Sequence, residues 1–227
     1  MDKALSWLAD TLDYKFSDPQ LFEQSLTHRS SPGASNERLE FLGDAVLDFA
    51  VSELVYLALP DADEGDLSRL RASLVKDTSL AELAAELGLG EQLILGSGER
   101  KTGGHRRESI LADALEALFG AVFLDAGYEA SKKTIQKAFG GRLLNLPDPR
   151  DLRDPKTRLQ EWLQARQMGL PDYSLVNVSG EAHRQKFEIR CTVDGEKNET
   201  TGTGSSRRNA EQQSAGRMLV ILAESDE

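Results

Sequence analysis

The apolar residues in the first two thirds of this chain recur at helical spacing, and this pattern restricts the fold more than any other feature. Leucine, phenylalanine, valine and alanine follow one another three or four residues apart from residue 3 to about residue 145, without convincing strand alternation. Signals for helix starts occur at Asp18-Pro19, near Asn36, at Asp77-Thr78 and near Ser109. The spacing predicts an all-α domain over residues 1–146.

The pattern changes after a proline-rich segment. NLPDPRDLRDP at 145–155 contains three prolines and few apolar residues, and it predicts a linker over residues 147–154. Beyond it the sequence predicts a helix in PKTRLQEWLQARQ, three short alternating strands, and a last helix in SRRNAEQQSAGRMLVILAE. We therefore expect an α+β multi-domain protein, in which the all-α domain is followed by an αβββα domain over residues 155–225.

The formal net charge of -11 at first argues against nucleic acid as a partner. The acid is unevenly distributed, because residues 1–150 hold 16 basic and 25 acidic residues whereas residues 151–227 hold 11 and 13. Three of the later acids lie in the terminal ESDE. The folded part of the second domain is therefore close to neutral, and its Arg207-Arg208 pair stands out locally.

The sequence also predicts a compartment. No apolar run approaches the roughly 20 residues that span a bilayer, and MDKALSWLADTL carries acids where a signal peptide would be basic and then apolar. Cys191 is the only cysteine, which excludes an intrachain disulfide and a Cys-based zinc site and suits a reducing compartment. It alternates with polar residues in KFEIRCTV, so we expect it on a buried strand face. These features predict a cytoplasmic protein.

An acidic stripe lies in the otherwise apolar segment NERLEFLGDAVLDF, residues 36–49. Glu37, Glu40, Asp44 and Asp48 would fall within an arc of about 80° on a helix. Like charges at this spacing cost about 0.2–0.5 kcal/mol per pair, so either water screens the stripe or a positive group lies against it. Gly43, beside Asp44, has two interpretations: close approach of another backbone, or a position that faces a neighbouring helix.

A second pair of acids lies in SILADALEALFGAVFLD, where Asp113 and Glu116 share a face of a helix that is otherwise apolar. Two ionised carboxylates there are costly unless cations or hydrogen bonds compensate for burial. Solvated faces on both helices remain an alternative, and for Asp48 alone this is the better interpretation. Clustered carboxylates without histidine or thiolate partners select hard ions such as Mg²⁺ or Mn²⁺, which can activate water and orient a phosphodiester. The pattern indicates phosphoryl transfer to water.

Other hydrolytic chemistries lack supporting motifs. No histidine has an HxxxH or HExxH partner, no GxSxG is present, and GSGERKTGG lacks the ending of a phosphate-binding P-loop. Lys101, Arg106 and Arg107 follow or lie within this glycine-rich segment. They either contact phosphates or belong to a flexible connection.

The segment NERLEFLGDAVLDF resembles the signature helix of the ribonuclease III family. LTHRS at 26–30, DEGD at 63–66 with the following LSRLRASLV, and RRESILADALEALFGAVFLD match the family at the expected places. The resemblance runs from about residue 5 to the end of the chain and implies a nuclease domain followed by a double-stranded RNA-binding domain. It implies an endoribonuclease that cuts double-stranded RNA with Mg²⁺, leaving 5′-phosphate and 3′-hydroxyl ends with short 3′ overhangs, and that processes rRNA precursors and other structured transcripts.

The resemblance also implies roles for single acids. The family's Mg²⁺ ligands match Glu40, Asp113 and Glu116, and Mn²⁺ can substitute as the ion. The residues usually named as catalytic match Asp44 and Glu116. Two acids that assist near the cleavage site match Glu37 and Glu64.

Family members are homodimers through the nuclease domain, so the resemblance implies a second copy of the chain as a partner. The residues themselves point weakly the same way. Phe41, Leu42 and Val46 flank the acids and cannot all face the small core of one monomer. Some apolar surface is therefore left for a partner subunit.

The second domain resembles the double-stranded RNA-binding domain in KTRLQEWLQ, GEAHRQKFEI and GTGSSRRNAEQQSA. Such domains recognise the shape, phosphates and 2′-hydroxyls of an A-form duplex, with little sequence preference. On the family pattern, the residues that reach two successive minor grooves are Thr157, Gln160, Glu161, Gln164 and His183. The residues that contact phosphates of the intervening major groove are Ser206, Arg207 and Arg208, at a helix start whose dipole favours anions.

Two other functions stay open at this stage. A non-catalytic duplex-RNA-binding protein would need no intact acids, so the presence of Glu40, Asp44, Asp113 and Glu116 weighs against it. A metal-dependent hydrolase of small phosphate esters would retain its turnover without residues 151–227.

Overall fold

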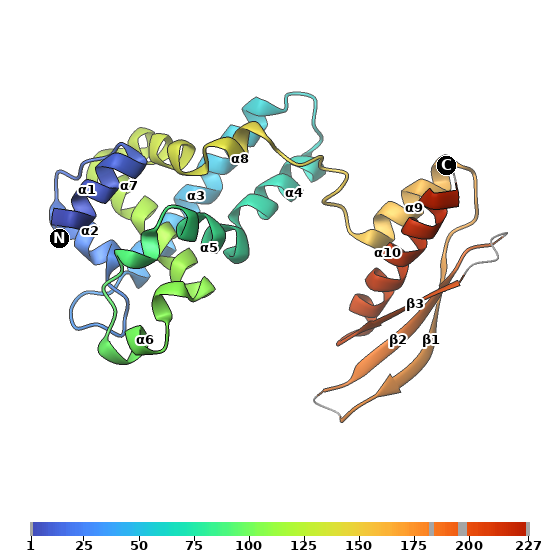
Figure 1. Ribbon diagram of the computed structural model, residues 1–227. Coiled ribbons are helices and arrows are strands. Elements are labelled where there is room, and N and C mark those ends of the chain that lie inside the picture. Colours follow the sequence, from blue (N-terminus) through green and yellow to red (C-terminus); the bar gives the residue numbers. More distant parts are fainter. Residues whose placement is uncertain (1, 182–183, 195–198, 226–227) are drawn as a thin grey trace. The chain divides into compact units, whose positions relative to one another are not determined.

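The computed structural model describes residues 2–181, 184–194 and 199–225. They form two compact units that divide between Pro149 and Arg150, a position inside the segment 147–154 (Figure 1). None of the described helices combines the length and the apolarity of a membrane span.

The N-terminal unit is built of helices, as the apolar spacing predicts. They are α1 (Asp2–Leu12), α2 (Pro19–Leu26), α3 (Glu37–Ala58), α4 (Glu64–Val75), α5 (Asp77–Glu86), α6 (Ser97–Lys101), α7 (Glu108–Phe139) and α8 (Gly141–Leu144), with short 3-10 turns at Leu89–Glu91 and Gly104–Arg106. Most of residues 97–106, which overlap the glycine-rich segment 96–104, lie in α6 and the second 3-10 turn.

A local signal accounts for the start of α2, and two other predicted starts lie within one residue of the observed ones. The carboxylate of Asp18 accepts the backbone N–H of Gln20 at 2.9 Å, and Pro19 occupies the first position of α2. Helix α3 begins directly after Asn36. Helix α7 begins at Glu108, one residue before the signal at Ser109.

Helix α7 is the core helix of this unit. Its residues Leu115, Leu118 and Phe119 are fully buried, and α2, α3 and α5 pack against it. The helix bends at Gly127, whose φ of 80° is accessible to glycine but strained for other residues. The acidic half of α7 precedes this bend, so Asp113 and Glu116 lie on a straight segment beside α3.

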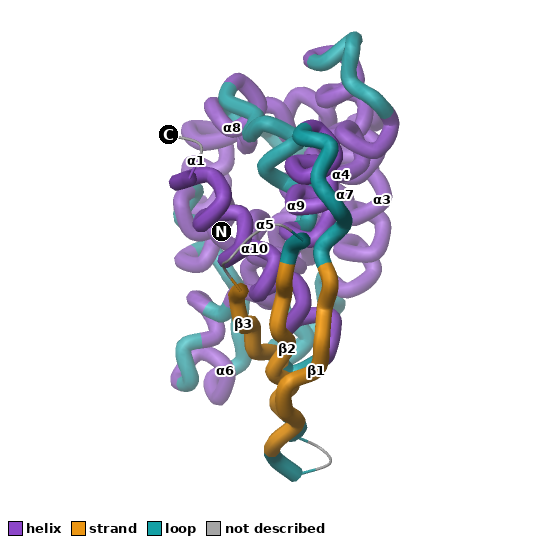
Figure 2. The backbone as a smooth tube through the Cα atoms, turned by 90° about the vertical axis from the view of Figure 1, so that its right-hand side faces the viewer, coloured by secondary structure: helices purple, strands orange, loops and turns teal. Residues whose placement is uncertain are grey.

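The C-terminal unit has the predicted αβββα order: α9 (Pro155–Ala165), β1 (Asp172–Ser179), β2 (Lys186–Thr192), β3 (Glu199–Gly204) and α10 (Arg207–Ser225). The strands form an antiparallel sheet in the order β1-β2-β3 (Figure 2). Leu159 and Leu163 of α9 and Met218 of α10 form one core cluster with Cys191 of β2. Cys191 is buried, as its alternation predicts.

Candidate active site

Two glycines bring the backbones of α3 and α7 into direct contact. A Cβ atom added at Gly43 would overlap the carbonyl oxygen of Glu116 and would lie 3.0 Å from the backbone nitrogen of Gly120. A Cβ atom added at Gly120 would overlap the carbonyl oxygen of Leu39 and lie 2.9 Å from the nitrogen of Gly43. Both interpretations of Gly43 therefore hold, because it faces a neighbouring helix at backbone distance.

This crossing places acids of the two helices within electrostatic reach of one another. Burial, followed by the charges of Asp44, Glu40 and Asp113, raises the pKa of Glu116 from 4.5 to about 8. Burial and the charges of Asp113 and Glu37 also raise the pKa of Glu40. The pKa of Asp113 is raised by burial first and then by Asp77. These acids form a carboxylate cluster at the crossing, defined here as Glu40, Asp44, Asp113 and Glu116.

A pocket of about 480 Å³ opens beside the carboxylate cluster. Glu37, Glu40 and Asp113 line it on the acidic side, whereas Asp44 and Glu116 do not line it. Two arginines from other segments, Arg29 and Arg107, also line it. The pocket lining therefore contains both acidic and basic side chains.

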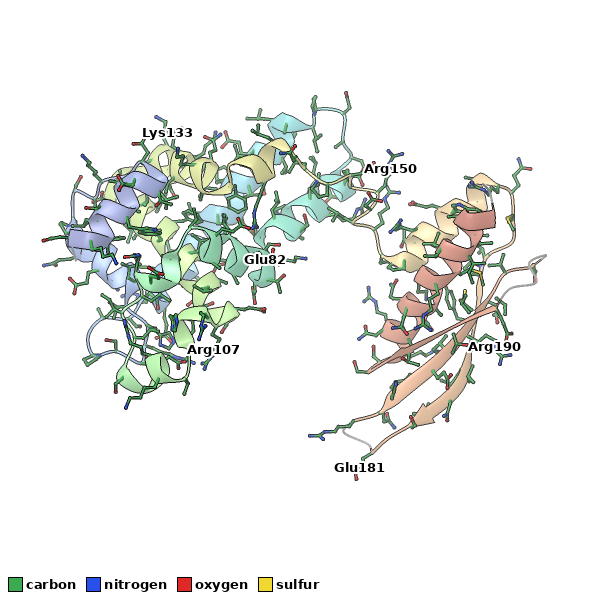
Figure 3. All side chains as sticks on the ribbon, in the orientation of Figure 1. Glu82, Arg107, Lys133, Arg150, Glu181 and Arg190 are labelled. Atoms are coloured by element: carbon green, nitrogen blue, oxygen red, sulfur yellow. The ribbon has the colours of Figure 1, made fainter. Side chains whose placement is uncertain are left out.

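Each of these arginines is held by an acid outside the cluster. Arg29 lies 3.5 Å from Glu37. Arg107, directly before α7 (Figure 3), lies 2.8 Å from Glu99 of α6. Arg107 lines the site pocket, whereas Arg106 lines a different pocket and Lys101 lines neither. Of Lys101, Arg106 and Arg107, Arg107 is thus the one beside the acids.

Glu64 and Asp48 do not belong to the carboxylate cluster. Glu64 lies in the first turn of α4, where its carboxylate accepts the hydroxyl of Ser68 at 2.9 Å. No contact within the described residues joins Glu64 to the carboxylate cluster. Asp48 lies one turn beyond Asp44 on α3 and is not among the main charges that raise the pKa of Glu40, Asp113 or Glu116.

Sequence reasoning missed three residues of the site. Arg29 and Asp77 act on the cluster through their charges, and His28 lines the pocket while its ring contacts the hydroxyl of Ser30 at 2.8 Å. The LTHRS motif that contains His28 and Arg29 was the available signal. Asp77 carried only the signal of a helix start.

A second pocket, of about 640 Å³, lies on the C-terminal unit between α9, α10 and the start of β1. Thr157, Gln160 and Arg208 line it together. Ser206 caps α10 through the backbone N–H of Asn209 at 3.2 Å.

The remaining residues predicted to face RNA differ in their surroundings. Glu161 forms an ion pair with Arg153, and Gln164 is exposed. Arg207 pairs with Glu211. His183 lies outside the described residues.

Two family models match consecutive parts of the chain. A Ribonuclease-III-like model matches residues 18–143, and a double-stranded RNA binding motif matches residues 155–222. A protein named Ribonuclease 3 from Nitrosococcus oceani is 51% identical over 229 residues, which cover 100% of this chain and 98% of that protein. The chain belongs to the ribonuclease III family.

Other proteins of the ribonuclease III family match at similar levels. Ribonuclease 3 from Hahella chejuensis is 53% identical over 224 residues, with 98% of each chain covered. The solved nuclease domain of ribonuclease III from Campylobacter jejuni is 44% identical, with a TM-score of 0.56, and the match covers 60% of this chain and 98% of that one. As a member of the ribonuclease III family, this chain is a double-strand-specific endoribonuclease with a C-terminal RNA-binding domain.

The donor set of the carboxylate cluster fits a hard divalent cation. All four donors are carboxylates, and burial followed by the charges of neighbouring acids raises the pKa of Glu40, Asp113 and Glu116, an effect that a bound cation would relieve. Within the described ranges, no group of three or more potential ligands is placed so that it could hold a metal ion.

We expect the stability of the metal-free protein to fall as pH rises toward the raised pKa of Glu116. The folded state favours neutral Glu116, so this contribution is fully present below the ordinary pKa of 4.5 and is lost as pH passes through about 8. Thermal unfolding in a chelator at about pH 6 and about pH 9 checks this, because the fall should be smaller in Glu116→Gln. Mg²⁺ should restore the wild-type melting temperature at the higher pH. An identical pH dependence in the two proteins would contradict the assignment.

Proposed function

We propose that this ribonuclease III hydrolyses phosphodiester bonds of double-stranded RNA at its carboxylate cluster with Mg²⁺, for which Mn²⁺ can substitute. The expected products carry 5′-phosphate and 3′-hydroxyl ends with short 3′ overhangs. The main support for the proposal is the crossing of α3 and α7 at Gly43 and Gly120, which brings four acids near one another. The same chain also has a duplex-RNA-binding domain.

In this proposal Glu40, Asp113 and Glu116 hold the ion, and Asp44 acts with Glu116 in catalysis. When bound, Mg²⁺ supplies an activated water and charge stabilisation at the departing oxygen. At neutral pH Glu116 must release its proton before it can act as a ligand, because its pKa lies near 8 in the metal-free cluster.

Supporting residues surround this cluster in the proposal. Glu37 holds Arg29 at the pocket rim, where both can face the RNA backbone. Glu64 keeps its predicted assisting role. Arg107 is a further cation in the lining of the pocket, where it is paired with Glu99.

Incubation of the protein with a defined RNA hairpin, once in Mg²⁺ and once in Ca²⁺, tests the proposal. The chain should cut the hairpin with Mg²⁺, and with Ca²⁺ it should bind the hairpin without cutting it, because Ca²⁺ accepts looser geometry and activates water less well. A non-catalytic RNA-binding protein would bind in both ions and cut in neither. A hydrolase of small phosphate esters would keep its turnover after deletion of residues 151–227.

We also propose that the protein works as a homodimer through its nuclease domain. Phe41, Phe49 and Tyr56 are 82%, 60% and 66% exposed and fall within about 80° of one another on α3. Leu124 of α7 adds a further exposed apolar side chain. An apolar stripe of this kind on a helix favours a protein partner, and the solved Campylobacter jejuni nuclease domain is described as having a region involved in dimer formation.

Replacing Phe41 with glutamate should shift this dimer toward monomer, because a charge would be buried in the interface. Light scattering across a concentration series measures the effect. Leu144→Glu is the matched control, because Leu144 is 85% exposed and lies on α8, outside the stripe. Equal dimerisation of Phe41→Glu and wild type would contradict the proposed interface.

The proposal also covers domain bounds and substrates. The nuclease domain comprises residues 1–146 and the RNA-binding domain residues 155–225, and the linker 147–154 joins them. The proposed substrates are rRNA precursors and other structured transcripts. A cytoplasmic location is supported by the lone buried cysteine, which suits a reducing compartment.

A further inference from the structure

Two cations of the RNA-binding domain share one carboxylate. Glu211 on α10 accepts a hydrogen bond from Nζ of Lys156 at 2.6 Å and from Nε of Arg207 at 3.1 Å, and its side chain is only 15% exposed. Lys156 also lies 4.5 Å from the ring centroid of Tyr173. Glu211 is thus fixed between two positive groups, one of which is predicted to contact phosphate.

The neighbouring Arg208 has different surroundings. Throughout the part of the chain that the structure describes, its side chain has no hydrogen-bond or ion-pair partner. It lines the pocket of about 640 Å³ together with Thr157 and Gln160, whereas Arg207 does not line this pocket. A duplex that contacts α9 through Thr157 and Gln160 therefore lies next to Arg208.

The ion pair changes what Arg207 can contribute to binding. The salt-dependent part of affinity arises because a cation replaces counterions condensed on the nucleic acid. A carboxylate at contact distance already opposes the charge of Arg207, and it also repels an approaching phosphate. Arg208 lines the same pocket as Glu211 and Asp154, but among the described residues it forms no ion pair or hydrogen bond with either acid.

We propose that Glu211 neutralises Arg207 and thereby makes Arg208 the dominant phosphate ligand of this domain. Glu211 is then a positioning residue that limits the affinity of the domain for duplex RNA. This inference rests on the proposed binding of duplex RNA through the C-terminal domain.

Binding of an RNA duplex by the full chain, measured in Ca²⁺ over a range of monovalent salt, separates the two arginines. Arg208→Ala should weaken binding about tenfold and lower the slope of log affinity against log salt by about 1. Arg207→Ala should weaken binding less than about threefold, and it should change the slope by less than half as much as Arg208→Ala does. Equal effects of the two substitutions, or a larger effect of Arg207→Ala, would overturn the inference.

The same two arginine substitutions in a Glu211→Gln background test whether the charge of Glu211 causes the difference. Glutamine keeps a hydrogen-bond acceptor but removes the charge, so Arg207→Ala should now cost about tenfold, as Arg208→Ala does. Glu188→Gln is the matched control, because Glu188 alternates with the buried Ile189 on β2 and lies on the sheet face away from the helices. In the Glu188→Gln background, Arg208→Ala should still weaken RNA binding more than Arg207→Ala does.

Melting temperatures of all variants show whether folding is intact, and the salt slope reports charge independently of stability. An unchanged effect of Arg207→Ala in the Glu211→Gln background would overturn the inference while leaving RNA binding established. A wild-type chain that binds no duplex at all would instead overturn the proposed function.

Discussion

Replacement of Glu116 by glutamine is expected to reduce cleavage of a duplex RNA at least about a thousandfold in Mg²⁺, because metal-held charge stabilisation is worth several kcal/mol. Glutamine keeps the shape of the side chain but removes the charge from the centre of the cluster. Binding of the same RNA in Ca²⁺ should stay close to that of the wild type, since the RNA-binding domain is unchanged. Single-turnover cleavage and equilibrium binding measure the two quantities.

The same substitution should raise the melting temperature of the metal-free protein. It removes the group whose pKa burial and neighbouring acids raise to about 8. Each kcal/mol gained corresponds to about 2–4 °C for a protein of this size. Higher stability together with lost activity would distinguish a functional acid from a structural one.

Asp48→Asn is the matched control for Glu116→Gln. Asp48 belongs to the same stripe on α3 but is not among the main charges that raise the pKa of the clustered acids. It should retain cleavage close to wild type. Equal cleavage by Glu116→Gln and Asp48→Asn would contradict the division of the stripe into functional and solvated acids.

Replacement of Gly43 by alanine is expected to lower both stability and cleavage. The added Cβ would overlap the carbonyl oxygen of Glu116, so α3 and α7 must move apart. Overpacking of this kind costs about 1–3 kcal/mol or more, because backbone atoms cannot rotate away as side chains can. The movement also separates Glu40 and Asp44 from Glu116, so cleavage should fall even at temperatures where the variant is folded.

Gly141→Ala is the control for this substitution. An added Cβ at Gly141 would meet only the side chain of Asn145, at 3.9 Å, and the glycine lies in a helix. Its melting temperature should equal or exceed that of the wild type. Wild-type melting temperature and turnover in Gly43→Ala would show that the close crossing is not required.

The sequence predicted the classes of structure because their signals are local. Helical spacing before residue 145 and strand alternation in segments such as KFEIRCTV depend only on neighbouring residues. The acids were also identifiable, since Glu40, Asp44, Asp113 and Glu116 interrupt helices that are otherwise apolar. Their grouping followed from the family resemblance rather than from spacing.

The crossing itself depends on residues far apart in the sequence. Gly43 could be read as a close approach, but Gly120 lies in the apolar run LFGAV, and only the packed helices show that the two glycines face each other. The charge of Asp77 reaches the cluster for the same reason, through the packing of α5 on α7. Likewise, Arg207 and Glu211 are readable as a helical pair four residues apart, whereas the contact of Lys156 with Glu211 joins two helices.

The end chemistry of products from a long RNA duplex tests the central claim most directly. Attack by a metal-activated water at clustered carboxylates should leave 5′-phosphate and 3′-hydroxyl ends on both strands, with short 3′ overhangs. Sequencing with and without phosphatase or kinase treatment identifies these ends. Products that carry 3′-phosphate or 2′,3′-cyclic phosphate ends would contradict the account, because the first requires departure of the 5′ oxygen instead of the 3′ oxygen and the second requires the 2′-hydroxyl as the nucleophile.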